Sequence, residues 1–269
     1  MKITFLGAGV YGGALAKVLE FNNHQVNFYD PYKYSDISLK DAIKEAEILI
    51  YAAPASAAED ILPQLPKDIP LVCVSKGFIS LKPFLGFEKF YTLGGAAFAE
   101  DIETAVSAAK SGSKVEPIVL AASDKLLAEL FSTDFLHIDP ILETKTILLC
   151  GALKNIYAIA AGYNQPENND KAFYDKIIAE WEEVLNVNGC DSRAVLAPCG
   201  FPDLVLCLNE RSRNFSYGLE LAEGNAPVIG NTTIEGIYAI NSIDRYPDFI
   251  VPEHADILKN IIKEVKDAA

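Results

Sequence analysis

The stretch GAGVYG, residues 7–12, decides how the first part of this chain folds. It has the pattern G-x-G-x-x-G, with a short apolar strand pattern before it and a helical pattern after it. Such a turn directs backbone N–H groups at a helix N-terminus toward the phosphates of a dinucleotide. We expect Gly7 to make the tight turn, Gly9 to admit the pyrophosphate, and Gly12 to let the helix pack closely against the sheet. The alternative is a tight strand-to-helix turn that binds nothing.

An acidic residue, Asp30, ends the next strand pattern, eighteen positions beyond Gly12. A carboxylate at this place can accept hydrogen bonds from the ribose 2′-OH of NAD, and it repels the 2′-phosphate of NADP. We therefore expect NAD(H) to be favoured as the cofactor, with NADP(H) remaining open. The alternative is that Asp30 and Pro31 only form a turn.

Short apolar runs alternate with helical patterns through the first half of the chain. We expect strands at residues 2–7, 25–30, 47–54, 69–77, 90–95, 116–123 and 134–139. Strands that alternate with helices form a parallel, doubly wound sheet of the Rossmann type, an α/β architecture. From residue 141 onward helical patterns follow one another almost throughout, the longest at 143–162. We therefore predict a dinucleotide-binding domain at residues 1–140 and an all-helical substrate-binding and catalytic domain at 141–269.

The composition excludes several classes of partner. The 269 residues include 23 Lys and Arg against 37 Asp and Glu, for a formal net charge of −14. We expect no binding to nucleic acid or to anionic membranes, because both need basic side chains. The five cysteines are odd in number and lack C-x-x-C spacing, so we expect neither a disulfide framework nor a metal site. A reducing, cytoplasmic location and no membrane insertion follow as expectations, since we find no signal peptide and no apolar run of membrane-spanning length.

A lysine interrupts the most apolar helical pattern of the chain. Residues 147–162 are apolar or small on every face, which indicates a buried helix, but Lys154 and Asn155 lie in its middle. Burying an ammonium group is costly unless it is paired, and burial lowers its pKa, so such a lysine can serve as a proton donor. The alternative is that Lys154 lies at the helix surface and extends its amine to solvent.

Seven motifs in order resemble one known family. They are GAGVYGGALA (7–16), VSKGF (74–78), LGGAAFAEDI (93–102), CGALKNIYAIAAG (150–162), GFPDLVLCL (200–208), SRNFSYGLELAEG (212–224) and TIEGIYA (233–239). Together they resemble the bacterial-type NAD(P)-dependent glycerol-3-phosphate dehydrogenase family over nearly the whole chain. The resemblance implies an oxidoreductase that interconverts dihydroxyacetone phosphate and sn-glycerol 3-phosphate for glycerophospholipid synthesis. Its partner would be a small phosphorylated substrate, and a homodimer remains open.

The resemblance also implies roles for single residues. Lys154 matches the catalytic lysine of the family, Lys76 a lysine that touches cofactor and substrate, and Asp203 an active-site aspartate. The remaining implied substrate contacts are Gly95, Ser212, Arg213 and Asn214. The remaining implied cofactor contacts are Val10, Tyr11, Ala99 and Glu235. Arg213 is implied to lie near the cofactor as well as the substrate. Ordinary roles are the alternatives: solvated cations for Lys76 and Arg213, and a helix cap for Asp203.

The chain departs from the family near the expected substrate. Ala97 stands where the family usually has a hydroxyl, the loop 163–172 has no glycine, and an arginine usual in the family is missing around 174–178. Two other functions therefore stay open. One is an NAD-dependent dehydrogenase for another small phosphorylated hydroxy or keto compound, and the other is a non-catalytic NAD(H)-binding module. The lysines and the aspartate argue against the module, because a protein that only senses NAD(H) needs no proton donor.

Overall fold

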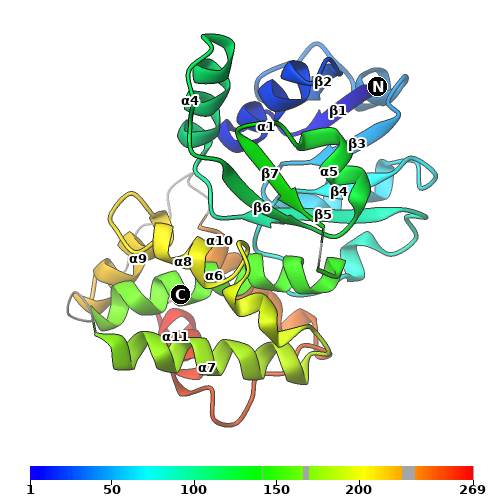
Figure 1. Cartoon of the computed structure of the whole chain (residues 1–269). Coiled ribbons are helices and arrows are strands. Elements are labelled where there is room, and N and C mark those ends of the chain that lie inside the picture. The colour runs from blue at the N-terminus through cyan, green and yellow to red at the C-terminus, as the bar shows by residue number, and fades with distance from the viewer. Residues whose placement is uncertain (141, 166–169, 226–233, 269) are drawn as a thin grey trace. The chain divides into compact units, whose positions relative to one another are not determined.

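The computed structural model of the chain describes residues 1–140, 142–165, 170–225 and 234–268 (Figure 1). Its contacts divide the chain into two compact units. The first unit consists of residues 1–75 and 82–144, and the second of residues 76–81 and 145–269. The short segment 76–81, which we assigned to the first domain by its position, groups with the helical second unit. Each unit is described by itself.

The first unit contains a sheet that, within the described residues, has seven strands in the order β2-β1-β3-β4-β5-β6-β7. The strands are β1 (Lys2–Leu6), β2 (Gln25–Tyr29), β3 (Ile48–Tyr51), β4 (Leu71–Cys73), β5 (Phe90–Gly95), β6 (Ile118–Ala122) and β7 (Leu136–Asp139). All four residues of β3 are buried, as expected for a central parallel strand that is covered on both faces. The predicted doubly wound α/β fold is thus confirmed.

The expectation of a fully parallel sheet is wrong for one pair of strands. β6 pairs with β5 in antiparallel orientation, whereas the other neighbouring pairs are parallel. Between them runs α4 (Ala99–Lys110), which packs against α1 (Val10–Phe21) (Figure 1). The chain therefore enters β6 at the end of the sheet where β5 finishes. A parallel β6 would need a crossover that carries the chain back to the end where β5 starts.

The other helices of the first unit cover the sheet or connect its strands. They are α2 (Leu39–Ile43), α3 (Ala58–Ile61) and α5 (Lys125–Phe131). α5 packs against β6 and β7, while α1 packs against β2. The core of this unit is built from aliphatic and aromatic side chains of strands and helices, such as Phe5, Leu15 and Phe131.

The described part of the second unit is helical. Its helices are α6 (Thr144–Asn164), α7 (Lys171–Val187), α8 (Phe201–Leu206), α9 (Arg213–Ala222), α10 (Glu235–Ser242) and α11 (Asp256–Asp267). α7 ends close to Gly189, whose φ of 69° is the left-handed conformation that favours glycine after a helix. Residues 166–169 of the loop after α6 lie outside the described residues.

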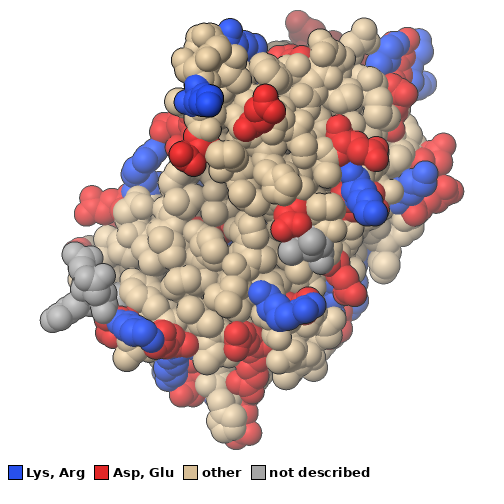
Figure 2. Space-filling model, viewed as in Figure 1, with Lys and Arg blue, Asp and Glu red and all other residues tan. Residues whose placement is uncertain are grey.

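α6 is long and apolar enough to cross a membrane, but it is a core helix here. Of its most apolar window, 89% is buried inside the protein. One side contacts α7 through Tyr157 and Trp181, whose stacked rings have centroids 5.4 Å apart. On the face that Figure 2 shows, basic side chains lie among acidic ones and form no continuous basic area within the described residues.

Candidate active site

The glycine turn after β1 gives each of its glycines a different environment. Gly7 has a φ of +105°, and a Cβ there would lie 2.7 Å from the backbone nitrogen of Ala53. A Cβ on Gly12 would lie 3.0 Å from the Cβ of Ala52, because α1 passes close to the strand end. A Cβ on Gly9 would meet nothing within 4 Å. The turn is therefore tight at Gly7, closely packed at Gly12 and open at Gly9.

The open space at Gly9 lies at the start of α1. Gly9 is the N-cap residue of this helix and offers no side-chain acceptor, and the first residue, Val10, is 72% exposed. The first N–H groups of a helix have no partner within the helix, so they are available to an anion. These features fit the pyrophosphate of a dinucleotide. Tyr11 follows Val10 and packs partly against the core.

Two further residues with implied roles belong to the same unit. Ala99 is the first residue of α4, so it also lies at a helix N-terminus. Gly95 is the last residue of β5, and a Cβ there would lie 2.8 Å from Cδ2 of Leu120 and 3.0 Å from its Cα. The close approach of β5 and β6 therefore requires glycine at position 95 for packing alone.

Asp30 ties the turn after β2 to the glycine turn. Its Oδ2 accepts a hydrogen bond from the N–H of Ala8 at 2.9 Å, and its Oδ1 accepts from the N–H groups of Tyr32 and Lys33 at 3.0 and 3.2 Å. The ammonium of Lys33 donates to the carbonyl of Ala8. The turn that we considered as an alternative is thus present. It still leaves acceptor capacity on the carboxylate, which has about four lone-pair sites.

Lys154 on α6 is buried rather than extended to solvent. Only 6% of the residue is exposed. Its Nζ donates a hydrogen bond to Sγ of Cys207 at 3.1 Å and lies 3.8 Å from Oδ1 of Asp203. Of the two alternatives left open by the sequence, the structure shows the buried, paired lysine.

Lys76 approaches the same carboxylate from the segment 76–81. Its Nζ donates to Oδ2 of Asp203 at 2.6 Å, and the two side chains are 16% and 4% exposed. Burial lowers the pKa of Lys76, but the charge and hydrogen bond of Asp203 more than offset this, so the pKa is raised. The stem of Lys76 lies against Gly151 of α6, where a Cβ would be 3.5 Å from Cγ. Two ammonium groups thus share one buried carboxylate, and we call Lys76, Lys154 and Asp203 the lysine–aspartate cluster.

α8 holds the carboxylate of this cluster in place. Asp203 lies in the first turn of α8, whose N-cap residue is Gly200. A Cβ on Gly200 would lie 2.3 Å from the carbonyl oxygens of Ala194 and Val195, so the start of the helix is pressed against the preceding segment. The side chain of Asp203 bonds Lys76, which differs from the helix cap that we considered as an alternative.

Ser212, Arg213 and Asn214 surround the start of α9. Ser212 is the N-cap residue, and its Oγ accepts a hydrogen bond from the N–H of Phe215 at 3.4 Å. Arg213 is the first helical residue and is exposed, whereas Asn214 is buried. A cation at a helix N-terminus is opposed by the helix dipole. An anion bound there would be attracted by both the guanidinium and the helix.

Two glycines allow α9 to pack directly on α6. A Cβ on Gly218 would lie 2.1 Å from the carbonyl oxygen of Ile159, and one on Gly162 would lie 2.1 Å from that of Phe215. Backbone thus meets backbone at this crossing. The crossing fixes the residues at the start of α9 relative to those on α6.

Sequence reasoning missed two polar neighbours of the candidate catalytic residues. Cys207 accepts the hydrogen bond of Lys154, although its place in an apolar motif gave no sign of this. Asn155 is fully buried and bonds Glu235 on α10 and Asn214 on α9. A signal for Asn155 existed, because it interrupts the same apolar helix as Lys154.

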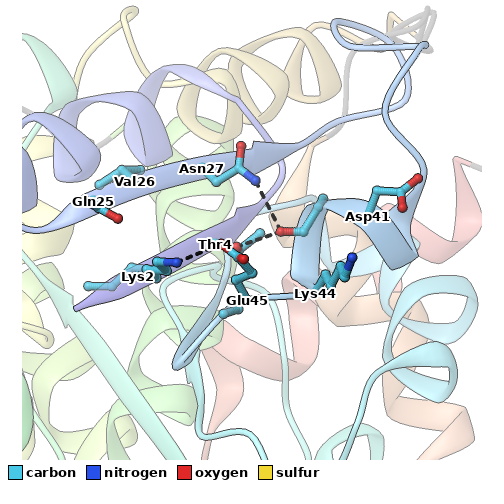
Figure 3. Close-up of a pocket in the computed structure, with 11 residues that line it drawn as sticks. Lys2, Thr4, Gln25, Val26, Asn27, Asp41, Lys44 and Glu45 are labelled. Carbon is cyan, nitrogen blue, oxygen red and sulfur yellow. Dashed lines mark hydrogen bonds and ion pairs between the residues drawn. The ribbon is translucent and has the colours of Figure 1, made fainter.

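A pocket of about 340 Å³ in the first unit lies elsewhere, where β1 and β2 begin beside α2 (Figure 3). Asn27 and Thr4 both donate to the carbonyl of Ala42, at 3.2 and 3.0 Å, and Lys2 pairs with Glu45 at 2.7 Å. Ligands of doubly wound sheets bind at the carboxyl ends of the strands. This pocket lies at the opposite ends, so it is not the candidate active site.

Comparisons of the sequence with known proteins find glycerol-3-phosphate dehydrogenases. Residues 143–264 match the family model described as NAD-dependent glycerol-3-phosphate dehydrogenase C-terminus. A glycerol-3-phosphate dehydrogenase, NAD(P)+, of Staphylococcus haemolyticus is 27% identical, with 90% of this chain and 87% of that protein covered. The enzyme of the same name from Neorickettsia sennetsu is 24% identical over 90% of this chain and 85% of its own.

Solved structures show the same fold. The crystal structure of glycerol-3-phosphate dehydrogenase from Coxiella burnetii aligns with a TM-score of 0.78 at 20% identity, covering 99% of this chain and 98% of that chain. The glycerol-3-phosphate dehydrogenase of Plasmodium falciparum aligns with a TM-score of 0.77 at 16% identity, over 100% of this chain and 92% of that chain.

Proposed function

We propose that this chain, which is similar to NAD(P)-dependent glycerol-3-phosphate dehydrogenases over 90% of its length, interconverts dihydroxyacetone phosphate and sn-glycerol 3-phosphate. The observation that carries the proposal is the lysine–aspartate cluster, in which Lys76 and Lys154 share the carboxylate of Asp203. Reduction of a ketone needs a proton and positive charge at the carbonyl oxygen, and two buried ammonium groups supply both.

Each member of the cluster has a distinct role in this proposal. Lys154 donates a proton from Nζ to the carbonyl oxygen, and its bond to Cys207 limits the directions in which Nζ can point. Lys76 stabilises the negative charge that develops on the same oxygen. Asp203 raises the pKa of Lys76 and so keeps it charged, and it holds both amines in place.

The cofactor part of the proposal rests on the glycine turn. Gly7, Gly9 and Gly12 would hold the pyrophosphate at the start of α1. Asp30 would accept a hydrogen bond from the ribose hydroxyl of NAD(H), with NADP(H) as the alternative cofactor. Bound NAD(P)H supplies the hydride for the carbonyl carbon. The open space at Gly9 and the uncapped helix start support this assignment.

The phosphate of the substrate is assigned to the start of α9. Arg213 is exposed there, and its guanidinium makes no hydrogen bond or ion pair within the part of the chain that the structure describes. A guanidinium can bind a phosphate through two parallel hydrogen bonds. Ser212 and Asn214 flank it with polar side chains.

A cytoplasmic location and a homodimer are also part of our proposal, and neither depends on this site.

Purified protein tests the proposal directly. NADH oxidation is followed with dihydroxyacetone phosphate, with unphosphorylated dihydroxyacetone and with a panel of other keto-phosphates. We expect turnover with dihydroxyacetone phosphate and very little with the unphosphorylated ketone. The panel is needed because Ala97 is buried and apolar where the family usually has a hydroxyl. Faster turnover of another keto-phosphate would replace the proposed substrate, and binding of NADH without any turnover would favour a non-catalytic module.

A further inference from the structure

Asn155 follows Lys154 on α6 and is 0% exposed. A buried amide side chain needs hydrogen-bond partners, and Asn155 has two that come from different helices. Its Nδ2 donates to Oε2 of Glu235 on α10 at 2.9 Å. Its Oδ1 accepts from Nδ2 of Asn214 on α9 at 3.0 Å. One side chain on the helix of the catalytic lysine thus connects an implied cofactor contact to an implied substrate contact.

The connection closes into a ring. Oδ1 of Asn214 accepts a hydrogen bond from the backbone N–H of Gly236 at 2.9 Å. Gly236 directly follows Glu235 in the chain, so the path returns to where it began. We call Asn155, Asn214, Glu235 and Gly236 the polar ring. It joins α6, α9 and α10 of the second unit.

The chemistry of the two ends fixes the direction of every hydrogen bond in the polar ring. A backbone N–H can only donate, and an ionised carboxylate can only accept. Each amide between them must therefore accept through its oxygen and donate through its nitrogen. Neither Asn155 nor Asn214 can flip its amide without breaking the ring. The two side chains are consequently held in one orientation.

Neighbouring atoms pack closely around Gly236. A Cβ on Gly236 would lie 2.8 Å from Oδ1 of Asn214, 2.8 Å from the carbonyl oxygen of Asn155 and 2.6 Å from Cδ1 of Ile159. The N-cap residue of α10, Ile234, has no side-chain acceptor, so Asn214 supplies the missing acceptor for the first turn. Asn214 therefore caps α10 from a different helix.

We propose that Asn155 is a positioning residue that sets the affinity for the cofactor through Glu235 and the affinity for the phosphorylated substrate through Asn214. Because Asn155 is fully buried, it reaches neither ligand itself. The inference rests on the proposed function in assigning Glu235 to the cofactor and Asn214 to the substrate. The donor and acceptor pattern of the polar ring is what makes an asparagine necessary at position 155.

A charge-swapping double-mutant cycle tests this role. Asn155→Asp keeps the shape of the side chain but replaces the donor to Glu235 by a second acceptor, so two carboxylates face each other. Adding Glu235→Gln restores a donor between the two positions, with the direction of the bond reversed. The dissociation constant of NADH is measured by fluorescence titration for the parent, both single variants and the double variant, and their melting temperatures are recorded.

We expect Asn155→Asp to weaken NADH binding by about tenfold or more when Glu235 is present, because a hydrogen bond to a charged group is lost. In the Glu235→Gln background the same change should cost only about threefold or less. The KM for dihydroxyacetone phosphate should rise in Asn155→Asp and fall back in the double variant. A merely structural role would lower the melting temperature of both variants that carry Asn155→Asp, without rescue of binding.

The result that overturns the inference is an equal loss of NADH affinity in both backgrounds, or no loss in either. If Asn155→Asp alone does not fold, the inference requires that the double variant folds and binds NADH, and failure of the double variant overturns it. A parent that binds NADH but does not reduce dihydroxyacetone phosphate overturns the proposed activity while the NADH cycle still decides the role of Asn155.

Discussion

The ammonium of Lys76 lies 2.6 Å from Oδ2 of Asp203, and the other oxygen of this carboxylate faces Nζ of Lys154 at 3.8 Å. One buried carboxylate thus lies between two amines, and the charge of Glu235 also raises the pKa of Lys76. In the proposed reaction, the two amines would stabilise the negative charge that develops on the carbonyl oxygen.

Replacing the shared carboxylate tests this arrangement. Burial alone lowers the pKa of Lys76, and Asp203 reverses that effect, so Asp203→Asn should bring the pKa of Lys76 down. We expect kcat to fall by about a hundredfold or more and its alkaline limit to move to lower pH. The pH profile of kcat is the measurement. Asp191→Asn is the matched control, because it breaks an exposed pair with Arg193. An unchanged alkaline limit in Asp203→Asn would argue against the assignment.

The same ion pair predicts how stability depends on pH. The pKa of Lys76 in the folded protein is raised above the ordinary value of 10.5, so the pair contributes its full stability below pH 10.5. That contribution is lost as the pH rises through the folded-state pKa, because the amine then loses its proton. We expect the difference in melting temperature between the parent and Asp203→Asn to be largest near pH 8 and to shrink as the pH rises. It shrinks first because Lys76 of the variant, with its lowered pKa, loses its unpaired charge, and above about pH 10.5 because the parent loses the contribution of its ion pair. A difference that grows above this pH would contradict the sign.

Removing the guanidinium at the start of α9 tests the phosphate assignment. Arg213→Ala should raise the KM for dihydroxyacetone phosphate by about tenfold or more, since a charge-assisted contact is lost. Unphosphorylated dihydroxyacetone should remain a very poor substrate of both proteins. Arg193→Ala removes the same charge from an exposed pair of the same unit and should leave the KM unchanged. An unchanged KM in Arg213→Ala would mean that the phosphate is bound elsewhere.

Cofactor choice depends on Asp30 in this account. The parent should use NADH more efficiently than NADPH, and Asp30→Asn should narrow the gap by removing the charge that repels the 2′-phosphate. The amide oxygen can still accept the bonds from Tyr32 and Lys33, whereas the bond from the N–H of Ala8 is lost because an amide nitrogen cannot accept it, so the fold should be kept at a lower melting temperature. Asp30→Ala loses these bonds as well and should also melt at a lower temperature. The ratio of kcat/KM for the two cofactors is the measurement, and equal efficiencies in the parent would refute the preference.

Part of this structure follows from local patterns in the sequence. Apolar residues on every face of 147–162 predicted a buried helix, and alternating strands and helices predicted the doubly wound sheet. The direction of β6 could not be predicted, because an apolar run looks the same for both strand directions. It depends on α4, which packs against α1 before the chain enters β6.

The candidate site depends on contacts that no local pattern encodes. Lys76 and Asp203 are 127 positions apart, so only the family resemblance connected them before the structure did. Cys207 and Asn155 were missed because thiol and amide groups take their roles from the partners that they meet. Gly236 looked like an ordinary residue of a motif, yet the close approach of Asn214 requires it.

The most direct test of the central claim is the turnover of Lys154→Met with dihydroxyacetone phosphate and NADH. Methionine fills the space of the buried stem but cannot donate a proton. With NADH binding close to that of the parent by fluorescence titration, we predict a loss of kcat of about a hundred- to ten-thousandfold. A variant that binds NADH and keeps a kcat near that of the parent would contradict the account, because the proton would then come from a group other than Lys154.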